Sequence, residues 1–321
     1  MENEAKSADA KSPYRYEESW SITQAMAELS EALRRGHDVA IKTSGSSGTP
    51  KEILLPASAL IFSARNSNNY LGAKPGERWS LLLSPTHTAG INVLVRSMEL
   101  GTEPVTVKQS ADYSAIVPTQ LYRALNEDSE LLAHLRSCKK VLVGGAAIDP
   151  ELLLKATNAG INCVTTYGMT ETCGGCVYDG VALPGVEIKI GETIEIKGAM
   201  LAKVPTIDGY FVTNDLGYLK DGKLFITGRI DDVIISGGKN ISLSAIESLL
   251  GFNYGAAGVP DSKWGTALII ATTDQDSESK IQSQLQTAFG VKAKSIIRVE
   301  AIPRTELQKV DRAALGKLLP R

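Results

Sequence analysis

Hydrophobic residues in the first half of the chain follow two alternating spacings. From Ser21 to Arg35 they recur at every third or fourth position, which is helical spacing, and Gly36 ends the segment. Short apolar runs of strand length separate such segments. The pattern predicts helices at Ser21–Arg35, Ser58–Leu71, Ile91–Leu100, Gln120–Asn126 and from Pro150, and strands at Val39–Thr43, Glu52–Leu55, Trp79–Leu83, Val105–Val107, Ser114–Thr119, Lys140–Val143 and Asn162–Thr166. Alternating strands and helices indicate a mostly parallel sheet flanked by helices, in which ligands bind where strands end in loops.

Beyond Gly180 the pattern becomes rich in strands. Val186–Ile190 and Thr193–Lys197 alternate with a period of two, and Gly217–Ile226 reads as a hairpin with Asp-Gly at its turn. A charged break at Gly228–Asp232 is followed by strands and helices of an α+β unit. We therefore expect an α/β N-terminal domain with a β-rich part over residues 1–228, and a small α+β C-terminal domain over residues 229–321.

Composition and charge exclude several functional classes. Of the 321 residues, 43% are hydrophobic, which suits a globular core. Lys and Arg total 34 against 36 Asp and Glu, so no basic excess points to nucleic acid. No apolar run reaches the roughly 18 residues of a membrane span, and the polar N-terminus lacks the apolar segment of a signal peptide. We expect a cytoplasmic protein without nucleic-acid partners or stable membrane association.

The cysteines include one C-x-x-C spacing. Of Cys138, Cys163, Cys173 and Cys176, the last two are separated by two glycines. This spacing suits a redox pair or half of a zinc site. A zinc site needs a second ligand pair, and the other two cysteines are isolated. We favour small residues that line a tight loop.

A stretch rich in glycine and hydroxyl groups is the strongest chemical signal. It reads Thr43, Ser44, Gly45, Ser46, Ser47, Gly48, Thr49, Pro50 and Lys51. Backbone N–H groups and hydroxyls that converge on one point suit a polyphosphate, and Lys51 adds a compact positive charge. It is not a Walker A loop, because that motif needs the lysine directly after the second glycine. A flexible linker is the alternative, but the stretch lies directly between two apolar strands.

Further candidates follow later strands or flank the charged break. Tyr167–Thr172 comes directly after a strand, so it faces the same end of the sheet as the phosphate loop. Beside phosphate, the Glu171 carboxylate suits Mg²⁺, although a lone Glu is more often solvated surface. Asp215 precedes the hairpin, Arg229 lies in the break, and Lys309 lies near the C-terminus.

Taken in order, these motifs resemble the adenylate-forming family of acyl-CoA synthetases, luciferases and peptide-synthetase adenylation domains. The resemblance runs from about Val39 to the C-terminus and implies the adenylate-forming fold. It implies an enzyme that uses ATP, Mg²⁺ and CoA to activate a small carboxylic acid. In the first step the acid and ATP give an acyl-adenylate and pyrophosphate, and in the second CoA gives the thioester and AMP.

The resemblance also implies roles for individual residues. Ser44 to Lys51 would hold the β- and γ-phosphates, with Thr43 also part of the nucleotide site. Thr170 would contact phosphate, and Glu171 would bind Mg²⁺. Asp215 and Arg229 would hold the ribose hydroxyls, and Lys309 would neutralise charge as pyrophosphate leaves. The rest of the nucleotide site would comprise Tyr167 stacked on adenine, Gly168, Met169, Gly144, Gly145 and Ala146. After a domain rotation, a second face with Gly237, Gly238 and Lys239 would meet CoA.

A narrower resemblance concerns the substrate. Tyr167–Gly180 and Pro85–Gly90 are similar to the corresponding segments of actinobacterial o-succinylbenzoate–CoA ligases, which serve menaquinone biosynthesis. It implies that His87, Cys173 and the two glycines after it surround the acyl group. His87 as an ordinary loop histidine is an equal alternative.

Two departures from the family limit what can be carried over. Only 42 residues precede the phosphate loop, fewer than in most members, so part of the outer sheet is expected to be missing. Acyl-pocket contacts and oligomer contacts therefore do not transfer, and a homodimer stays open. Gln308 stands where the family commonly has glycine. The competing functions are an adenylating ligase for another aryl or short-chain acid and a non-catalytic carrier-domain partner.

Overall fold

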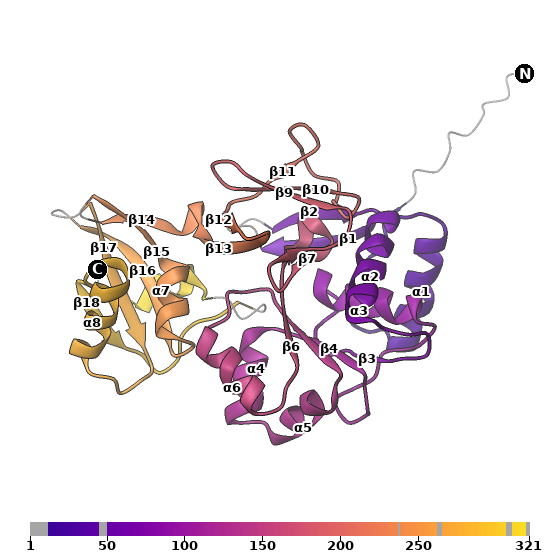
Figure 1. Cartoon of the computed structure of the whole chain (residues 1–321), viewed down its shortest axis with the longest axis horizontal. Helices are drawn as coiled ribbons and strands as arrows, with labels where there is room; N and C mark the ends of the chain where they lie inside the picture. The colour runs from indigo at the N-terminus through magenta and orange to yellow at the C-terminus, as the bar shows by residue number, and fades with distance from the viewer. Residues whose placement is uncertain (1–11, 45–49, 237, 262–264, 306–309, 319–321) are drawn as a thin grey trace, which may run out of the picture.

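A mixed sheet forms the centre of the N-terminal part. The computed structural model describes residues 12–44, 50–236, 238–261, 265–305 and 310–318. Neighbouring strands follow the order β3–β4–β5–β6–β7–β8 (Figure 1). Strands β3 to β6 are parallel, β7 pairs antiparallel with β6, and β8 pairs antiparallel with β7. Their bounds are Trp79–Ser80, Tyr113–Ile116, Lys140–Val143, Cys163–Met169, Gly174–Tyr178 and Val181–Ala182. The predicted α/β fold is confirmed.

Helices cover both faces of this sheet, because alternate side chains of its strands point to opposite sides. Tyr113, Leu142 and Val164 pack with residues of α3, whereas Val141 and Val143 pack with α4 to α6. The helices are α1 Ile22–Arg34, α2 Ala57–Leu71, α3 Thr88–Glu99, α4 Pro118–Asn126, α5 Ser129–Ser137 and α6 Pro150–Asn158.

Some predicted boundaries are wrong, for local reasons. Val105–Val107 is not a strand, since only Val105 makes an isolated bridge to Ser80. The strand predicted to reach Thr119 ends at Ile116, because Pro118 starts α4 at a position where its missing N–H costs nothing. Helix α5 was not predicted, although Asp128 caps it by accepting from Leu131 N–H at 2.9 Å. The strand predicted to begin at Trp79 is only two residues long.

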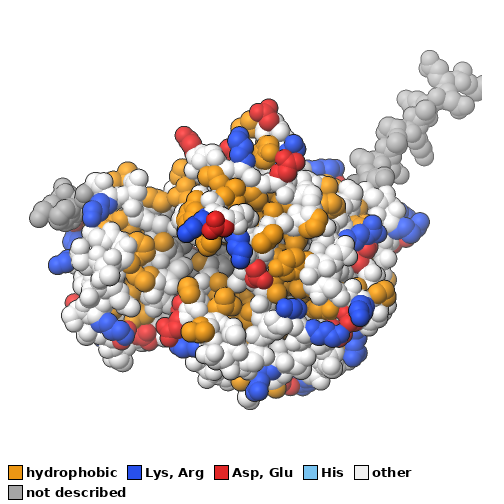
Figure 2. Space-filling model, in the orientation of Figure 1, with side chains coloured by type: hydrophobic (Ala, Val, Ile, Leu, Met, Phe, Trp, Pro, Cys, Tyr) orange, Lys and Arg blue, Asp and Glu red, His pale blue; other side chains and the backbone are white. Residues whose placement is uncertain are grey.

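Two small antiparallel sheets follow. One contains β9 Val186–Ile190, β10 Ile194–Gly198 and β11 Phe211–Val212, and the other is the hairpin of β12 Asp215–Lys220 and β13 Lys223–Arg229. Hydrophobic side chains gather across the upper middle of the face in Figure 2. In the hairpin, Tyr218 and Phe225 stack at 5.2 Å between ring centroids and are 47% and 41% exposed.

The C-terminal part has its own sheet and core. Strands follow the order β15–β14–β17–β16, with β18 beside β17 (Figure 1). The strands are β14 Val233–Ser236, β15 Lys239–Ser242, β16 Tyr254–Asp261, β17 Gly265–Thr272 and β18 Ser295–Arg298, and the helices are α7 Leu243–Leu250, α8 Glu278–Phe289 and α9 Arg312–Leu318. Among the residues that the structure describes, their buried apolar side chains cluster with one another and not with those of the N-terminal part. Across the two parts, Tyr122 stacks on Phe252 at 4.6 Å.

Within the described ranges, no helix combines the length and hydrophobicity that spanning a bilayer requires.

Candidate active site

Two paired strands flank the predicted phosphate loop. Strands β1 (Val39–Ser44) and β2 (Pro50–Leu55) pair antiparallel, with Thr43 opposite Lys51. The Thr43 hydroxyl donates to the Lys51 carbonyl at 3.3 Å, which closes the base of the loop. Residues 45–49 lie outside the described part of the chain. The connection runs from strand to strand, in agreement with the absence of a Walker A motif.

A short 3-10 turn, η1 (Thr170–Thr172), connects β6 to β7 and packs against β2. The Thr172 hydroxyl accepts from Met169 N–H at 2.9 Å and donates to the Gly174 carbonyl at 2.7 Å, so the turn is braced internally. Tyr167, Gly168 and Met169, which were predicted to lie in a loop, form the end of β6. Gly168 is required there, because a Cβ would lie 2.1 Å from the Gly174 carbonyl oxygen.

This turn presents two of the predicted residues. The Thr170 hydroxyl accepts from the Thr88 hydroxyl at 3.0 Å, a partner that the sequence did not suggest. The Glu171 carbonyl accepts from Ala202 N–H at 2.9 Å, which holds the backbone. Among the described residues, no hydrogen-bond or ion-pair partner is found for the half-buried Glu171 carboxylate, so its oxygens are available to a ligand.

Three predicted residues from separate strands form one polar network. Tyr167 Oη donates to Asp215 Oδ2 at 2.8 Å, and Arg229 Nη1 donates to Asp215 Oδ1 at 3.0 Å. Asp215 is buried and faces Arg229 across the open end of the β12–β13 hairpin. Burial and the nearby Asp215 charge raise the pKa of Tyr167 far above its ordinary value, so the phenol remains a donor.

Asp231 holds the opposite side of the Arg229 guanidinium. It accepts from Arg229 Nε and Nη2, both at 2.8 Å, and from Asn214 Nδ2 at 3.2 Å. The hydrogen bond from Arg229 lowers the pKa of Asp231, and the same bond raises that of the arginine. The sequence placed Asp231 in the charged break, but nothing in its spacing identified it as the second partner of Arg229.

The first glycine after β5 packs against the end of β6. A Cβ on Gly144 would lie 2.1 Å from Thr166 Oγ1, next to Tyr167 in the chain, so any side chain would displace the end of β6. Gly145 has a φ of +83°, a conformation that favours glycine. The predicted nucleotide segment Gly144–Ala146 therefore begins against the end of β6, and its first residue must be glycine because the Thr166 side chain occupies the position of a Cβ.

His87 occupies the N-cap position of α3 and is half-buried. Its backbone N–H donates to the Ser84 carbonyl at 3.1 Å. Gly90 permits this tight connection, since a Cβ there would lie 2.2 Å from the same carbonyl oxygen. The residue after His87, Thr88, donates its hydroxyl hydrogen bond to Thr170, so His87 lies one residue from a contact with the η1 turn.

Two of the predicted site residues, Lys239 and Gly238, lie in the C-terminal part of the chain. Lys239 Nζ donates to the Gly290 carbonyl at 2.7 Å, at the end of α8 in the C-terminal part. Gly238, with a φ of +78°, has open space around it. Gly237 and Lys309, like residues 45–49, lie outside the described residues.

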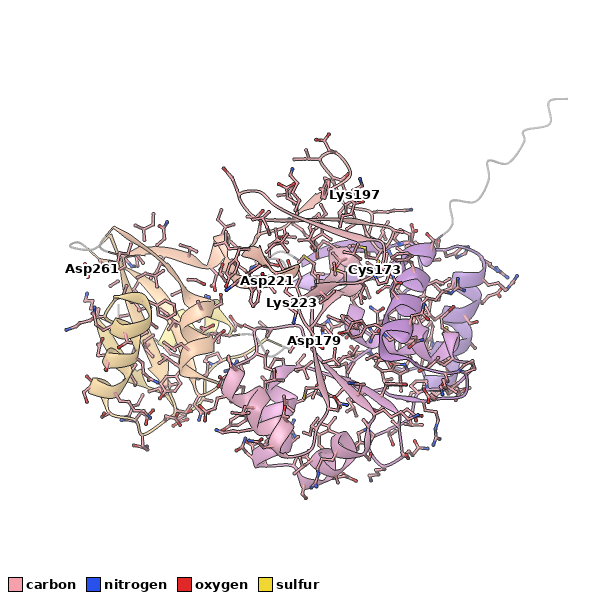
Figure 3. All side chains as sticks on the ribbon, in the orientation of Figure 1. Cys173, Asp179, Lys197, Asp221, Lys223 and Asp261 are labelled. Atoms are coloured by element: carbon pink, nitrogen blue, oxygen red, sulfur yellow. The ribbon has the colours of Figure 1, made fainter. Side chains whose placement is uncertain are left out.

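The C-x-x-C segment is not the tight loop that was predicted. Cys173 lies in the turn before β7, with a φ of 48°, while Cys176 lies within the strand. Cys173 is seen where β7 meets the helices of the N-terminal part (Figure 3). Both thiols are free and buried, and burial raises their pKa to about 12. Ser63 Oγ and Asn92 Nδ2 donate to the Cys173 carbonyl at 3.1 and 2.9 Å.

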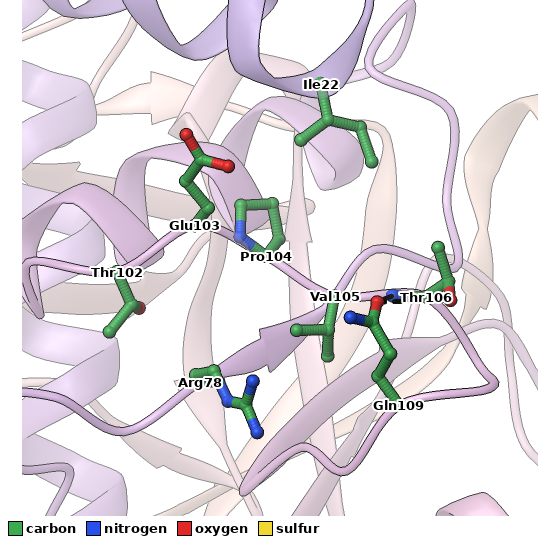
Figure 4. A pocket seen from close by; sticks show the side chains of 8 residues that line it. All are labelled: Ile22, Arg78, Thr102, Glu103, Pro104, Val105, Thr106 and Gln109. Carbon is green, nitrogen blue, oxygen red and sulfur yellow. Dashed lines mark hydrogen bonds between the residues drawn. The ribbon is translucent and has the colours of Figure 1, made fainter.

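A surface pocket of about 490 Å³ lies elsewhere, beside the connection from α3 to β4. Figure 4 shows its side chains, among them Arg78, Glu103 and Gln109. None of the residues that line it is a predicted site residue, and we assign it no role.

Comparisons with known proteins agree with the motifs. The family model described as AMP-binding enzyme matches residues 7–195. The chain is 36% identical to a probable 2-succinylbenzoate–CoA ligase of Mycobacterium tuberculosis, over 88% of this chain and 86% of the relative. It is 30% identical to the 2-succinylbenzoate–CoA ligase of Listeria monocytogenes, over 85% of this chain and 68% of that protein.

Solved structures show the same likeness. The o-succinylbenzoate CoA synthetase of Bacillus subtilis, in complex with the acyl-adenylate intermediate, superimposes with a TM-score of 0.75 and 26% identity, over 86% of this chain and 68% of that one. The same protein in complex with ATP and a magnesium ion gives a TM-score of 0.75 and 25% identity, over 87% of this chain and 69% of that one.

Proposed function

Because this chain belongs to the AMP-binding enzyme family, we propose that it is an ATP-dependent acid–CoA ligase that converts 2-succinylbenzoate to 2-succinylbenzoyl-CoA. The reaction has two steps. The acid carboxylate attacks the α-phosphorus of ATP, which gives the acyl-adenylate and releases pyrophosphate. The CoA thiol then attacks the acyl carbon, and AMP leaves. Identity to ligases of this substrate supports the choice of acid.

One observation carries the proposal. The turn η1 packs on β2, which bears Lys51, and the adjoining β6 presents Tyr167 to Asp215 and Arg229. Groups suited to phosphate, a metal ion, a base and a ribose therefore converge from separate parts of the chain. A binding module has no need for this combination of groups.

The residues present fit a nucleotide. Asp215 accepts one hydrogen bond on each oxygen and keeps lone pairs for ribose hydroxyls, since a carboxylate offers about four acceptor sites. We assign the edge of adenine to Gly144–Ala146 with Tyr167 alongside, because Gly144 packs against Thr166, the residue before Tyr167. Lys51 and Thr170 serve the phosphates, together with residues 45–49.

Glu171 fits a magnesium ion. Its carboxylate has no partner among the described residues, and Mg²⁺ usually takes one or two carboxylates together with phosphate oxygens. When bound, the ion supplies positive charge to the phosphates. Lys309, from the C-terminal part, stabilises the charge that develops as pyrophosphate leaves.

The two parts of the chain act in turn. Residues 1–228 hold ATP and the acid, and residues 229–321 supply Lys309 for the first step. The second part then rotates about Asp231 and presents Gly237, Gly238 and Lys239 to CoA. The separate hydrophobic cores of the two parts and the open surroundings of Gly238 support this arrangement.

Pyrophosphate release with a panel of acids tests the proposal. Each acid is assayed with and without CoA, and the thioester is identified by mass spectrometry. We expect 2-succinylbenzoate to exceed benzoate and straight-chain acids in kcat/KM. Equal turnover of a simple fatty acid would reject the assigned acid but keep the ligase, whereas no pyrophosphate release with any acid would reject the ligase itself.

A further inference from the structure

A cluster of three charged side chains joins the charged break to the last helix. Arg312, the first residue of α9, donates from Nε to Asp232 Oδ1 at 2.5 Å. Its Nη1 and Nη2 donate to the two carboxylate oxygens of Glu247 on α7, at 2.6 and 3.2 Å. The carboxylates of Asp232 and Glu247 are 11% and 16% exposed, so water screens these contacts little.

Backbone groups complete the cluster. Asp232 Oδ2 accepts from Ser244 N–H at 2.8 Å, and Glu247 Oε1 accepts from Ala256 N–H at 2.8 Å. Arg312 Nη1 also donates to the Ala256 carbonyl at 2.8 Å. The break, the start of α7, the strand β16 and α9 are therefore tied through one guanidinium.

The place of this cluster in the chain suggests its purpose. Asp232 belongs to the 3-10 turn η2 (Ile230–Asp232), together with Asp231, about which we propose that the C-terminal part rotates. Arg312 follows Lys309 by three positions (312 − 309). Between them, Val310 forms an isolated bridge with Arg304, and Asp311 N–H donates to the Pro303 carbonyl at 2.9 Å.

Folding stability alone does not require such a cluster. Taking charges out of water is costly, and apolar residues of similar volume often stabilise a fold as well as a buried ion pair does. Directional contacts do what apolar packing does not, because they fix the orientation of one element relative to another.

We propose that Arg312 is a positioning residue that holds the chain segment next to Lys309 in a fixed relation to the pivot at Asp231, through Asp232 and Glu247. The inference rests on the proposed function. Rotation at the pivot then moves that segment together with the whole C-terminal part. Weakening the cluster impairs adenylate formation, which uses Lys309, and spares acyl transfer to CoA, which uses the opposite face.

The test uses the full chain with Asp232→Asn and Arg312→Lys. Asp232→Asn keeps the size of the side chain and leaves the Arg312–Glu247 pair intact, whereas Arg312→Lys keeps the positive charge but loses the two-point contact to Glu247. Arg298→Gln is the matched control, since Arg298 is an exposed arginine of the same part that donates to the Asp276 carbonyl at 3.1 Å. We measure pyrophosphate release from acid and ATP, and thioester formation from supplied acyl-adenylate and CoA.

We expect each test variant to lower pyrophosphate release by about a hundredfold, the order seen when a reacting group is displaced by about 1 Å. Thioester formation should stay within about twofold of wild type for both variants and for the control, because each leaves the face that meets CoA in place. Equal loss in both steps would indicate a merely structural role and overturn the proposal, as would unchanged pyrophosphate release in both variants.

Hydrogen exchange separates failure of this inference from failure of the proposed function. Peptides that cover residues 230–232 and 310–318 should exchange faster together in Asp232→Asn, and not in Arg298→Gln. This readout needs no activity, so it tests the link even if wild type releases no pyrophosphate. Unchanged exchange at 310–318 in Asp232→Asn would overturn the link between the pivot and α9.

Discussion

Replacing Asp215 by asparagine tests the nucleotide site most directly. In the structure each carboxylate oxygen accepts one hydrogen bond, from Tyr167 and from Arg229. An asparagine oxygen can still accept from Arg229, and its amide can donate to the Tyr167 oxygen. The internal network is therefore retained, while the negative charge and one acceptor oxygen are lost.

The expected loss follows from the hydrogen bonds to ribose. A hydrogen bond to a charged group contributes about 1.5–3 kcal/mol, so losing one weakens ATP binding by roughly 10- to 150-fold. Folding stability should fall by only about 1–3 kcal/mol, because Arg229 keeps its acceptor while the Tyr167 hydroxyl proton loses its own. Thermal unfolding of the variant checks this second expectation.

Deoxynucleotides distinguish a ribose contact from a general electrostatic effect. Binding of ATP, 2′-deoxy-ATP and 3′-deoxy-ATP is measured by calorimetry for wild type and Asp215→Asn. For wild type, loss of the contacted hydroxyl should weaken binding by an amount similar to the mutation. For the variant, loss of the same hydroxyl should cost little more, because the two changes remove one shared interaction.

Asp231→Asn is the matched control. Asp231 also contacts the Arg229 guanidinium but lies on its other side, so the same chemical change should leave the difference between ATP and its deoxy forms as in wild type. If Asp215→Asn and wild type lose the same factor for every deoxynucleotide, the carboxylate does not contact the ribose and the reasoning is wrong.

Three further predictions concern the metal, the pivot and the thiols. Glu171→Gln should lower pyrophosphate release on the order of a hundredfold by removing a preorganised charge, and near-normal release would exclude Glu171 as the metal ligand. Asp231→Pro should release pyrophosphate normally in a single turnover but transfer the acyl group to CoA slowly. Lys309→Ala should fail at pyrophosphate release but transfer the acyl group from supplied acyl-adenylate. Equal effects of each variant on both steps would rule out rotation about Asp231. Because burial raises the thiol pKa of Cys173 and Cys176 to about 12, iodoacetamide at pH 8 should modify them only after unfolding. The double alanine variant should keep most activity under reducing conditions. Elemental analysis should find no stoichiometric zinc. Rapid native alkylation of either would contradict their burial.

The sequence by itself determined the α/β architecture and the order of the site motifs. Hydrophobic spacing is a local property, so it predicted most helices and strands, and it failed where a tertiary neighbour decides. Val105 has a strand-like run but pairs at a single position, and Asp128 starts a helix that apolar spacing did not reveal. The phosphate loop and the metal-binding role of Glu171 are predictions from the sequence, since glycine, hydroxyl and carboxylate groups indicate chemistry without coordinates.

Only the tertiary structure decided which of these groups meet. Tyr167, Asp215 and Arg229 are far apart in the chain, and their hydrogen bonds depend on the β12–β13 hairpin lying beside the end of β6. The bonds of Arg312 to Asp232 and Glu247 depend likewise on α7 and α9 both packing against β16, and no sequence motif indicated them. Side-chain hydrogen bonds extend about 3 Å, so residues separated by tens of positions become partners only when the packing of elements brings them within that distance.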